Sequence, residues 1–140
     1  MRILIFMLLL LATPAASQSY EAEMDCLARN IYFESRGEPL EGQYAVAYVT
    51  LNRVLDSRWP DTICEVVYEP NQFSWTTNRD RPIREHDAWV DAQTVARSAY
   101  IQYHMLGRDI TDGAVYFNAA GRQHYHGDLT LVVGGHKFYM

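Results

Sequence analysis

The sequence has few of the features that mark a nucleic-acid-binding or membrane-spanning protein. Acidic residues outnumber basic ones by 17 to 12, and the formal net charge at pH 7 is −5. The lysines and arginines form no cluster along the chain, whereas a polyanion partner favours a basic patch. The main apolar run, residues 3–12, is well short of the ~20 residues that a helix needs to cross a bilayer. We therefore expect neither a nucleic-acid partner nor a stable membrane anchor.

Motifs for metal or nucleophilic chemistry are also missing. The sequence has no His-Glu-x-x-His helix and no Gly-x-Ser-x-Gly turn. His124 and His126 would share one face of a strand, but no third ligand is obvious because the other histidines lie in different segments. We expect no metal and no cofactor.

The N-terminus has the three-part pattern of a secretory signal. Arg2 is followed by the apolar run and then by a small-residue stretch at residues 14–17. This pattern predicts a signal peptide at residues 1–17, with an approximate cleavage site, and one domain at residues 18–140. Loss of Arg2 would change the formal net charge from −5 to −6. We expect an exported protein, periplasmic or secreted; a retained, uncleaved anchor is the alternative.

The chain has only two cysteines, Cys26 and Cys64, and both follow the predicted signal peptide. An even number of cysteines in an oxidising compartment favours one disulfide. The bridge would connect the first helix to a later segment. Two buried free thiols are the alternative interpretation.

Apolar residues at helical spacing predict four helices. They are expected at residues 21–36, 39–54, 64–68 and 84–106. The second has such a wide apolar band that we expect it to be a buried central helix.

The spacing becomes strand-like after the last predicted helix. Extended runs are expected at residues 114–118, 129–133 and 137–140, and the last two flank a glycine pair as a hairpin. The predicted fold class is therefore α+β, mostly helical, with a small sheet near the C-terminus.

One segment, residues 71–82, has no clear period but carries Phe73 and Trp75 among polar side chains. A loop of this composition is typical of a lid over the core or of a substrate-binding rim.

Glu34 is the strongest candidate for a catalytic residue. On a helix, Leu27, Ile31 and Glu34 lie on one face, so the carboxylate is placed among apolar side chains. Burial raises the pKa of a carboxyl group, and a protonated Glu near neutral pH can act as a general acid. The alternative is a surface Glu at a helix end that pairs with Arg36 or with another arginine.

Several separated blocks of the sequence resemble the catalytic domain of SleB-type cell-wall hydrolases, the spore-cortex-lytic family. These blocks are residues 26–39, 42–47, 51–54, 63–68, 72–75 and 135–139. The resemblance implies a lysozyme-like, mostly helical fold that acts on the glycan strands of peptidoglycan. It also implies that Glu34, in the Glu-Ser-Arg-Gly-Glu motif, is the catalytic acid of a lytic transglycosylase. Such enzymes cleave between N-acetylmuramic acid and N-acetylglucosamine and leave a 1,6-anhydro ring on the muramic acid.

A single carboxyl group is sufficient for this reaction because the substrate's own O6 hydroxyl is the nucleophile. A hydrolytic muramidase would need a second carboxylate about 5–9.5 Å from the first. Glu38, Glu41 and Asp80 are candidates, and the spacing selects none of them. Glu38 follows Gly37, so a structural or capping role is the favoured interpretation. A non-catalytic wall-binding module is the rival from another class.

Further substrate contacts are expected from three places in the sequence. Gln72, Phe73 and Ser74 would line a sugar groove, unless Phe73 packs into the core. Tyr116 and Asn118 alternate along a strand and share one face, toward either the cleft or the core. His136 would bind a sugar or stabilise the hairpin. We expect a monomer, and an exported wall enzyme suits both a bacterium that remodels its wall and a phage endolysin.

Overall fold

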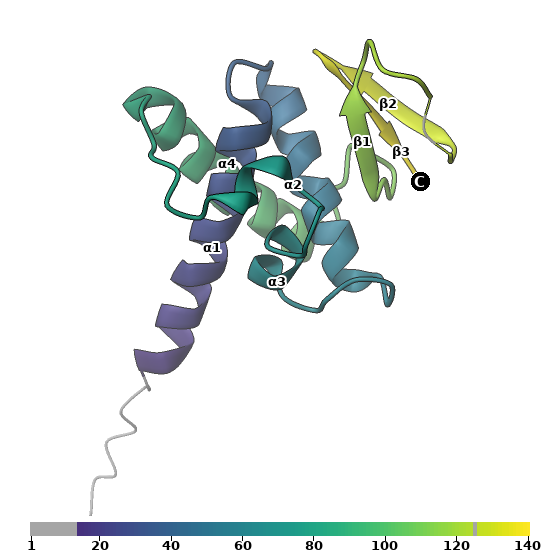
Figure 1. Cartoon of the computed structure of the whole chain (residues 1–140). Helices are drawn as coiled ribbons and strands as arrows, with labels where there is room; N and C mark the ends of the chain where they lie inside the picture. The colour runs from purple at the N-terminus through teal and green to yellow at the C-terminus, as the bar shows by residue number, and fades with distance from the viewer. Residues whose placement is uncertain (1–13, 125) are drawn as a thin grey trace, which may run out of the picture.

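The computed structural model describes residues 14–124 and 126–140. Its elements are α1 (Pro14–Ser35), α2 (Leu40–Leu55), α3 (Ile63–Val67), the 3-10 helix η1 (Ser74–Thr77), α4 (His86–Leu106), β1 (Tyr116–Ala119), β2 (Leu129–Val133) and β3 (His136–Tyr139). The strands form one antiparallel sheet in the order β1-β3-β2. The sheet lies at one side of the helices, and the C-terminus follows its central strand, β3 (Figure 1). The predicted α+β fold class is confirmed.

The first helix begins earlier than the apolar spacing predicts, at Pro14 rather than at residue 21. Proline is tolerated in the first turn of a helix, and alanine is the strongest helix former, so residues without an apolar stripe can still extend it. The predicted signal peptide, residues 1–17, lies mostly outside the described residues, and the prediction of its cleavage stays a prediction.

Two glycines end the long helices as their positions predict. Gly37 after α1 and Gly107 after α4 have φ angles of 84° and 62°. This left-handed conformation is easily reached by glycine because it has no Cβ. The N–H groups of Gly107 and Arg108 donate to the carbonyls of Tyr103 and Gln102, which satisfies the last turn of α4.

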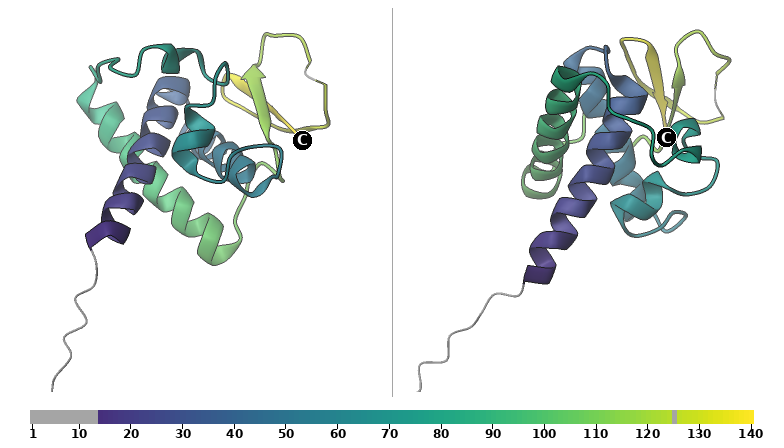
Figure 2. Two further views of the ribbon diagram at one scale, coloured as in Figure 1. Left: turned by 60° about the horizontal axis from the view of Figure 1, so that its bottom comes forward. Right: turned by 60° about the vertical axis from the view of Figure 1, so that its left-hand side comes forward.

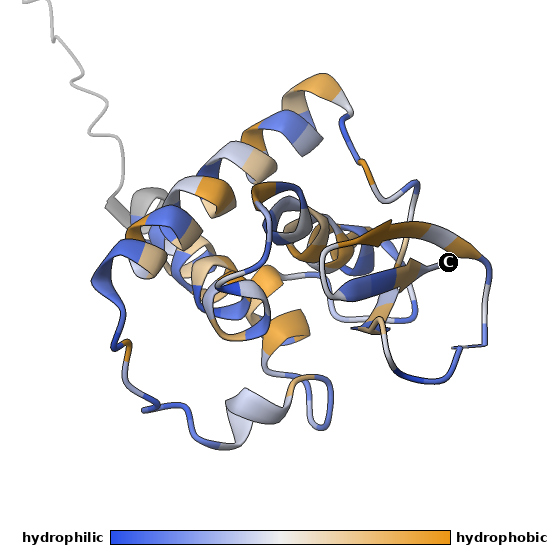
Figure 3. Ribbon diagram, turned by 90° about the horizontal axis from the view of Figure 1, so that it is seen from above, coloured by the Kyte–Doolittle hydropathy of each residue, from blue (hydrophilic) through white to orange (hydrophobic). Residues whose placement is uncertain are grey.

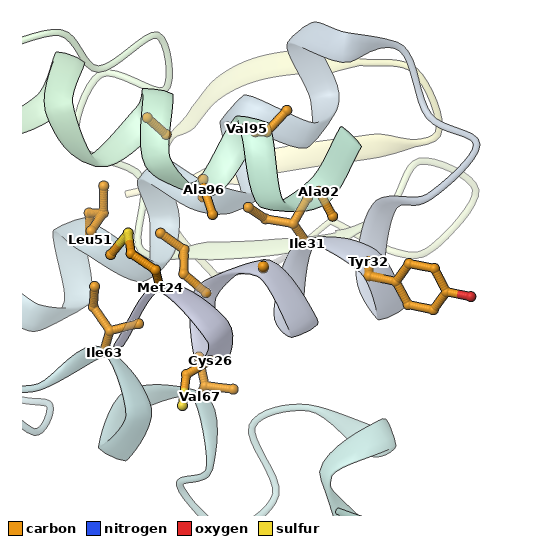
Figure 4. Close-up of a cluster of buried hydrophobic side chains, with 14 of the residues drawn as sticks. Met24, Cys26, Ile31, Tyr32, Leu51, Ile63, Val67, Ala92, Val95 and Ala96 are labelled. Atoms are coloured by element: carbon orange, nitrogen blue, oxygen red, sulfur yellow. The ribbon is translucent and has the colours of Figure 1, made fainter. Parts of the chain in front are cut away.

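Helix α2 is the centre of the fold, as predicted. Residues 45–53 of this helix are all buried. One side packs against α1 and α4, and the other packs against the sheet through contacts of Ala45, Val46 and Val49 with Phe138. Figure 4 shows the larger cluster, which includes Cys26 of α1, Leu51 of α2, Val67 of α3 and Ala96 of α4.

The segment at residues 71–82, which carries Phe73 and Trp75, packs against the end of α1. Phe73 and Trp75 are 4% and 2% exposed. The Trp75 indole N–H donates to the side chain of Asn30, and its ring stacks on Phe33 with centroids 4.8 Å apart. The short helix η1 was not predicted, because one turn is too short to show a period. Figure 3 shows that most of the chain between α3 and α4 is hydrophilic.

The same connection then crosses the C-terminal end of α1 (Figure 2). Arg29 donates to the carbonyls of Arg79 and Arg81 at 3.0 and 3.1 Å. The hydroxyl of Tyr32 accepts the backbone N–H groups of Arg84 and Glu85, each at 3.1 Å. These bonds fix an otherwise irregular segment to the helix that carries Glu34.

Among residues 14–124 and 126–140, no helix is both long enough and apolar enough to cross a membrane.

The predicted disulfide is present and joins Cys26 of α1 to Cys64 of α3, with a sequence separation of 38. Thr62 is the N-cap of α3 and accepts the N–H of Glu65. Glu23 of α1 also accepts the N–H of Ile63 at 2.6 Å, so α3 is bound to α1 by both covalent and polar contacts.

We expect the disulfide to stabilise the fold by about 3–4 kcal/mol, because it closes a long loop in the unfolded chain. The double variant Cys26→Ala/Cys64→Ala should lose about this much free energy of unfolding, measured by urea denaturation. Thiol labelling of denatured, unreduced wild-type protein should find no reactive cysteine. Two labelled thiols per chain would contradict the bridge.

Candidate active site

Glu34 lies one residue before the end of α1 and lines an open pocket of about 520 Å³. The other lining residues come from the connection between α3 and α4. They are Asn71, Gln72, Phe73, Ser74 and Thr77. The structure therefore brings together Glu34 and the loop triplet at residues 72–74, which the sequence analysis proposed as one site.

The carboxylate of Glu34 is partly buried and forms no hydrogen bond or ion pair with any residue that the structure describes. Burial raises the pKa of Glu34, and the positive charges of Arg53 and Arg81 act in the opposite direction. Burial is the larger effect, so the proton is held more tightly than on an exposed Glu.

Arg36 does not form the alternative surface ion pair with Glu34; it pairs with another carboxylate. The Arg36 Nε donates to Glu85 at 2.8 Å, and its guanidinium lies over the Tyr32 ring at 4.9 Å. Arg36 therefore stabilises the start of α4 against α1 rather than neutralising Glu34.

Arg53 of α2 is a site residue whose role the sequence analysis did not identify. It is buried, its Nε donates to the carbonyl of Val115 at 2.7 Å, and its guanidinium lies 5.4 Å from the centre of the Phe73 ring. A second ring, that of Trp59, lies 5.5 Å away. One feature of the sequence could have identified Arg53. It is a charged residue within the apolar band of a helix expected to be buried, and burial of a charge needs a structural or functional reason.

Glu38 has a structural contact and does not face Glu34 in the same pocket. Its carboxylate accepts the backbone N–H of Gly135 at 2.7 Å, which joins the α1–α2 turn to the β2–β3 hairpin. A Cβ at Gly135 would lie 2.8 Å from a carboxylate oxygen of Glu38, so a larger residue there would displace the end of this side chain. The other two candidates for a second catalytic carboxylate, Glu41 and Asp80, are both exposed. The charged groups that act on Glu34 are guanidinium groups.

Tyr116 and Asn118 do not line the pocket of Glu34. Tyr116 meets the edge of Trp59, with ring centroids 5.6 Å apart. The amide of Asn118 donates to the carbonyl of Gln123 at 3.0 Å, and its oxygen accepts the hydroxyl of Tyr139. These contacts stabilise the sheet and the loop after β1.

His136 lies on the opposite face of the sheet, at the ladder position across from Ala119. Its ring meets the edge of Phe117 at 5.4 Å, and Phe117 in turn lies 6.2 Å from Phe73. Burial lowers the pKa of His136, and the charge of Glu38 acts in the opposite direction. Aromatic rings therefore connect His136 to the pocket, and His136 belongs to the hairpin that Glu38 contacts.

Within the described part of the chain, no group of three or more His, Cys, Asp or Glu side chains is placed to hold a metal ion. The chemistry that the pocket itself can perform is proton transfer. Glu34 can donate a proton to a bound oxygen, and the nearby guanidinium charges can then stabilise its carboxylate.

The raised pKa of Glu34 predicts a pH-dependent gain of stability in Glu34→Gln. At pH 7 the unfolded state ionises Glu34 freely, whereas burial disfavours ionisation in the folded state, so the variant should have a larger free energy of unfolding. The gain should disappear as the pH falls below the ordinary value of 4.5, where Glu34 is neutral in both states. Urea denaturation at several pH values measures it, with Glu41→Gln as the exposed control. A gain that does not change with pH would contradict the burial of the charge.

The contact between Glu38 and Gly135 predicts a stability loss in Glu38→Ala. The substitution removes the acceptor of the exposed Gly135 N–H, which water can replace, and should cost about 0.5–1.5 kcal/mol. Thermal denaturation should show a lower midpoint than for Glu41→Ala, since Glu41 is an exposed neighbour. Equal midpoints would show that the contact contributes nothing.

Comparisons with known proteins place the chain in a family. The cell wall hydrolase family matches residues 37–139, a range that begins three residues after Glu34. A spore cortex-lytic enzyme of Oceanobacillus iheyensis is 33% identical over 108 residues, which cover 75% of this chain and 36% of that enzyme. A spore cortex-lytic enzyme of Bacillus cereus is 33% identical over 95 residues, covering 68% and 34%. The chain thus spans about a third of the length of these relatives.

Solved structures agree with the sequence comparison. The catalytic domain of the Bacillus cereus SleB protein aligns with a TM-score of 0.70 at 27% identity, over 86% of this chain and 91% of that domain. The catalytic domain of the germination-specific lytic transglycosylase SleB from Bacillus anthracis aligns with a TM-score of 0.68 at 28% identity, over 84% and 93%. The chain therefore shares the fold of these catalytic domains, and it belongs to the cell wall hydrolase family.

Proposed function

We propose that this protein cleaves the glycan strands of peptidoglycan as a lytic transglycosylase, with Glu34 as its general acid and base. The observation that carries the proposal is a single partly buried carboxyl group, with a raised pKa, in an open pocket. Membership of the cell wall hydrolase family supports the substrate class. The name of the similar Bacillus anthracis domain supports the transglycosylase reaction.

In the proposed reaction Glu34 first donates its proton to the glycosidic oxygen between N-acetylmuramic acid and N-acetylglucosamine. The bond from this oxygen to C1 breaks as positive charge develops on the muramic acid ring. The carboxylate of Glu34 then accepts the proton of the O6 hydroxyl while O6 bonds to C1. No water is consumed, and the product carries a 1,6-anhydro ring.

The surroundings of Glu34 suit both halves of this cycle. Burial favours the protonated form that starts the reaction, and the charges of Arg53 and Arg81 favour the carboxylate that follows. Gln72 and Ser74 are exposed on the pocket wall and can bind sugar hydroxyl and acetamido groups, whereas Phe73 supports that wall from the core. His136, Tyr116 and Asn118 would then act on the sheet rather than on the sugar.

The setting of the proposed reaction is outside the cytoplasm, where peptidoglycan lies. The signal-like N-terminus and the disulfide suit export to an oxidising compartment. We propose that the protein acts as a monomer.

The proposed reaction predicts a specific product. Mass spectrometry of fragments released from purified peptidoglycan should find muropeptides that lack a reducing end. Each should be lighter by one water than the corresponding product of hydrolysis. Glu34→Gln should release fragments about 10²–10⁴ times more slowly, because it removes the general acid. Glu41→Gln, an exposed carboxylate on the next helix, is the matched control and should act as wild type.

Other products would identify the alternatives. Fragments with reducing ends would indicate a hydrolytic muramidase and a second carboxylate. Binding of glycan without release of any fragment, by wild type and Glu34→Gln alike, would indicate a wall-binding module. Release at the wild-type rate by Glu34→Gln would contradict the role of Glu34.

A further inference from the structure

A second pocket lies beside the pocket of Glu34 and has a different chemical character. We name it the arginine pocket. It has a volume of about 290 Å³ and is lined by Tyr32, Phe33, Arg36, Arg81, Pro82, Arg84 and Glu85. The basic residues come from the end of α1 and from the segment that crosses it.

The arginine pocket concentrates positive charge in a chain that is acidic as a whole. Three guanidinium groups and one carboxylate, that of Glu85, line it, while the formal net charge of the chain is −5. Glu85 forms an ion pair with Arg36, so Arg81 and Arg84 provide the remaining positive charge. Asp80 lies in the same segment but does not line the pocket. Arg81 and Arg84 are close in the sequence, and folding adds Arg36 to them.

Neighbouring residues at the end of α1 line the two pockets. Phe33 lines the arginine pocket, and the next residue, Glu34, lines the other. The Phe33 ring stacks on Trp75 on one side, and the Arg81 guanidinium lies 5.1 Å from its centre. The charge of Arg81 also acts on Glu34. A ligand whose reacting bond lies at Glu34 can therefore extend a substituent into the arginine pocket.

We propose that the arginine pocket binds a free carboxylate of the stem peptide that the muramic acid of the substrate carries. This inference rests on the proposed function, since it assumes a peptidoglycan strand at Glu34. The guanidinium fork matches a carboxylate in a paired geometry, which a lysine ammonium does not. An extended peptide advances about 3.5 Å per residue, so its first carboxylates stay close to the sugar that bears them. The enzyme would accordingly prefer glycan whose peptides are present and charged.

The test compares two soluble glycan substrates that differ only in charge. One carries native stem peptides, and in the other the peptide carboxylates have been converted to amides. Wild-type protein should cleave the native substrate with a kcat/KM about tenfold higher, as expected for the loss of one charge-assisted contact. The preference should decrease with added salt, because exposed charges are screened. This comparison requires no variant.

Variants locate the effect in the arginine pocket. Arg84→Gln should reduce the preference for the native substrate about fivefold to tenfold, mainly through KM, and Arg84→Lys should give an intermediate value. Arg108→Gln is the matched control, because Arg108 follows the C-terminal end of α4, about 30 Å along the helix from His86 at 1.5 Å per residue. The Arg108 variant should keep the wild-type preference.

The outcomes separate this inference from the proposed function. Equal cleavage of the two substrates by wild type, or an equal loss on both in Arg84→Gln, would overturn the arginine pocket and leave the proposed function intact. Cleavage of neither substrate by wild type would contradict the proposed function, and the inference would fail with it.

Discussion

The buried side-chain amide of Asn30 connects the three segments on which the candidate site depends. Its NH₂ group donates to Thr50 of α2, and its oxygen accepts the indole N–H of Trp75 in η1. Asn30 itself is on α1, one helical turn before Glu34, and is fully buried. An unpaired amide at this depth would be costly, so the wall formed by residues 71–77 is held in one position relative to Glu34.

This arrangement explains how a small domain keeps a carboxyl group partly out of water without neutralising it. Phe33 and Trp75 stack beside Glu34 at the end of α1, and the charge of Arg53 acts on Glu34 from α2. Arg53 is itself anchored by the carbonyl of Val115, just before β1. The electrostatic environment of Glu34 therefore depends on the sheet, although no strand residue lines its pocket.

Local patterns in the sequence were sufficient for most of the secondary structure, except the start of α1 and η1, and for part of the site. The buried helix α2, the stops at Gly37 and Gly107, the hairpin and the disulfide all follow from spacing, conformational preference or composition, which act over short distances. Residues 72–74 were proposed as sugar contacts from the amide and aromatic composition of their loop. The roles of Asn30 and Arg53 and the arginine pocket could not be predicted, because each depends on contacts between residues far apart in the chain.

The disulfide has a topological consequence for the site. It closes a covalent ring from Cys26 to Cys64, and this ring contains Asn30, Glu34 and Arg53. A single proteolytic cut anywhere within the ring would leave both pieces of the chain attached to each other. Such a nicked protein would still carry its acid and the opposing guanidinium in one covalent unit, held by the packing of α1, α2 and α3. In surroundings that contain proteases, this domain can lose the continuity of its backbone without releasing its proposed catalytic group.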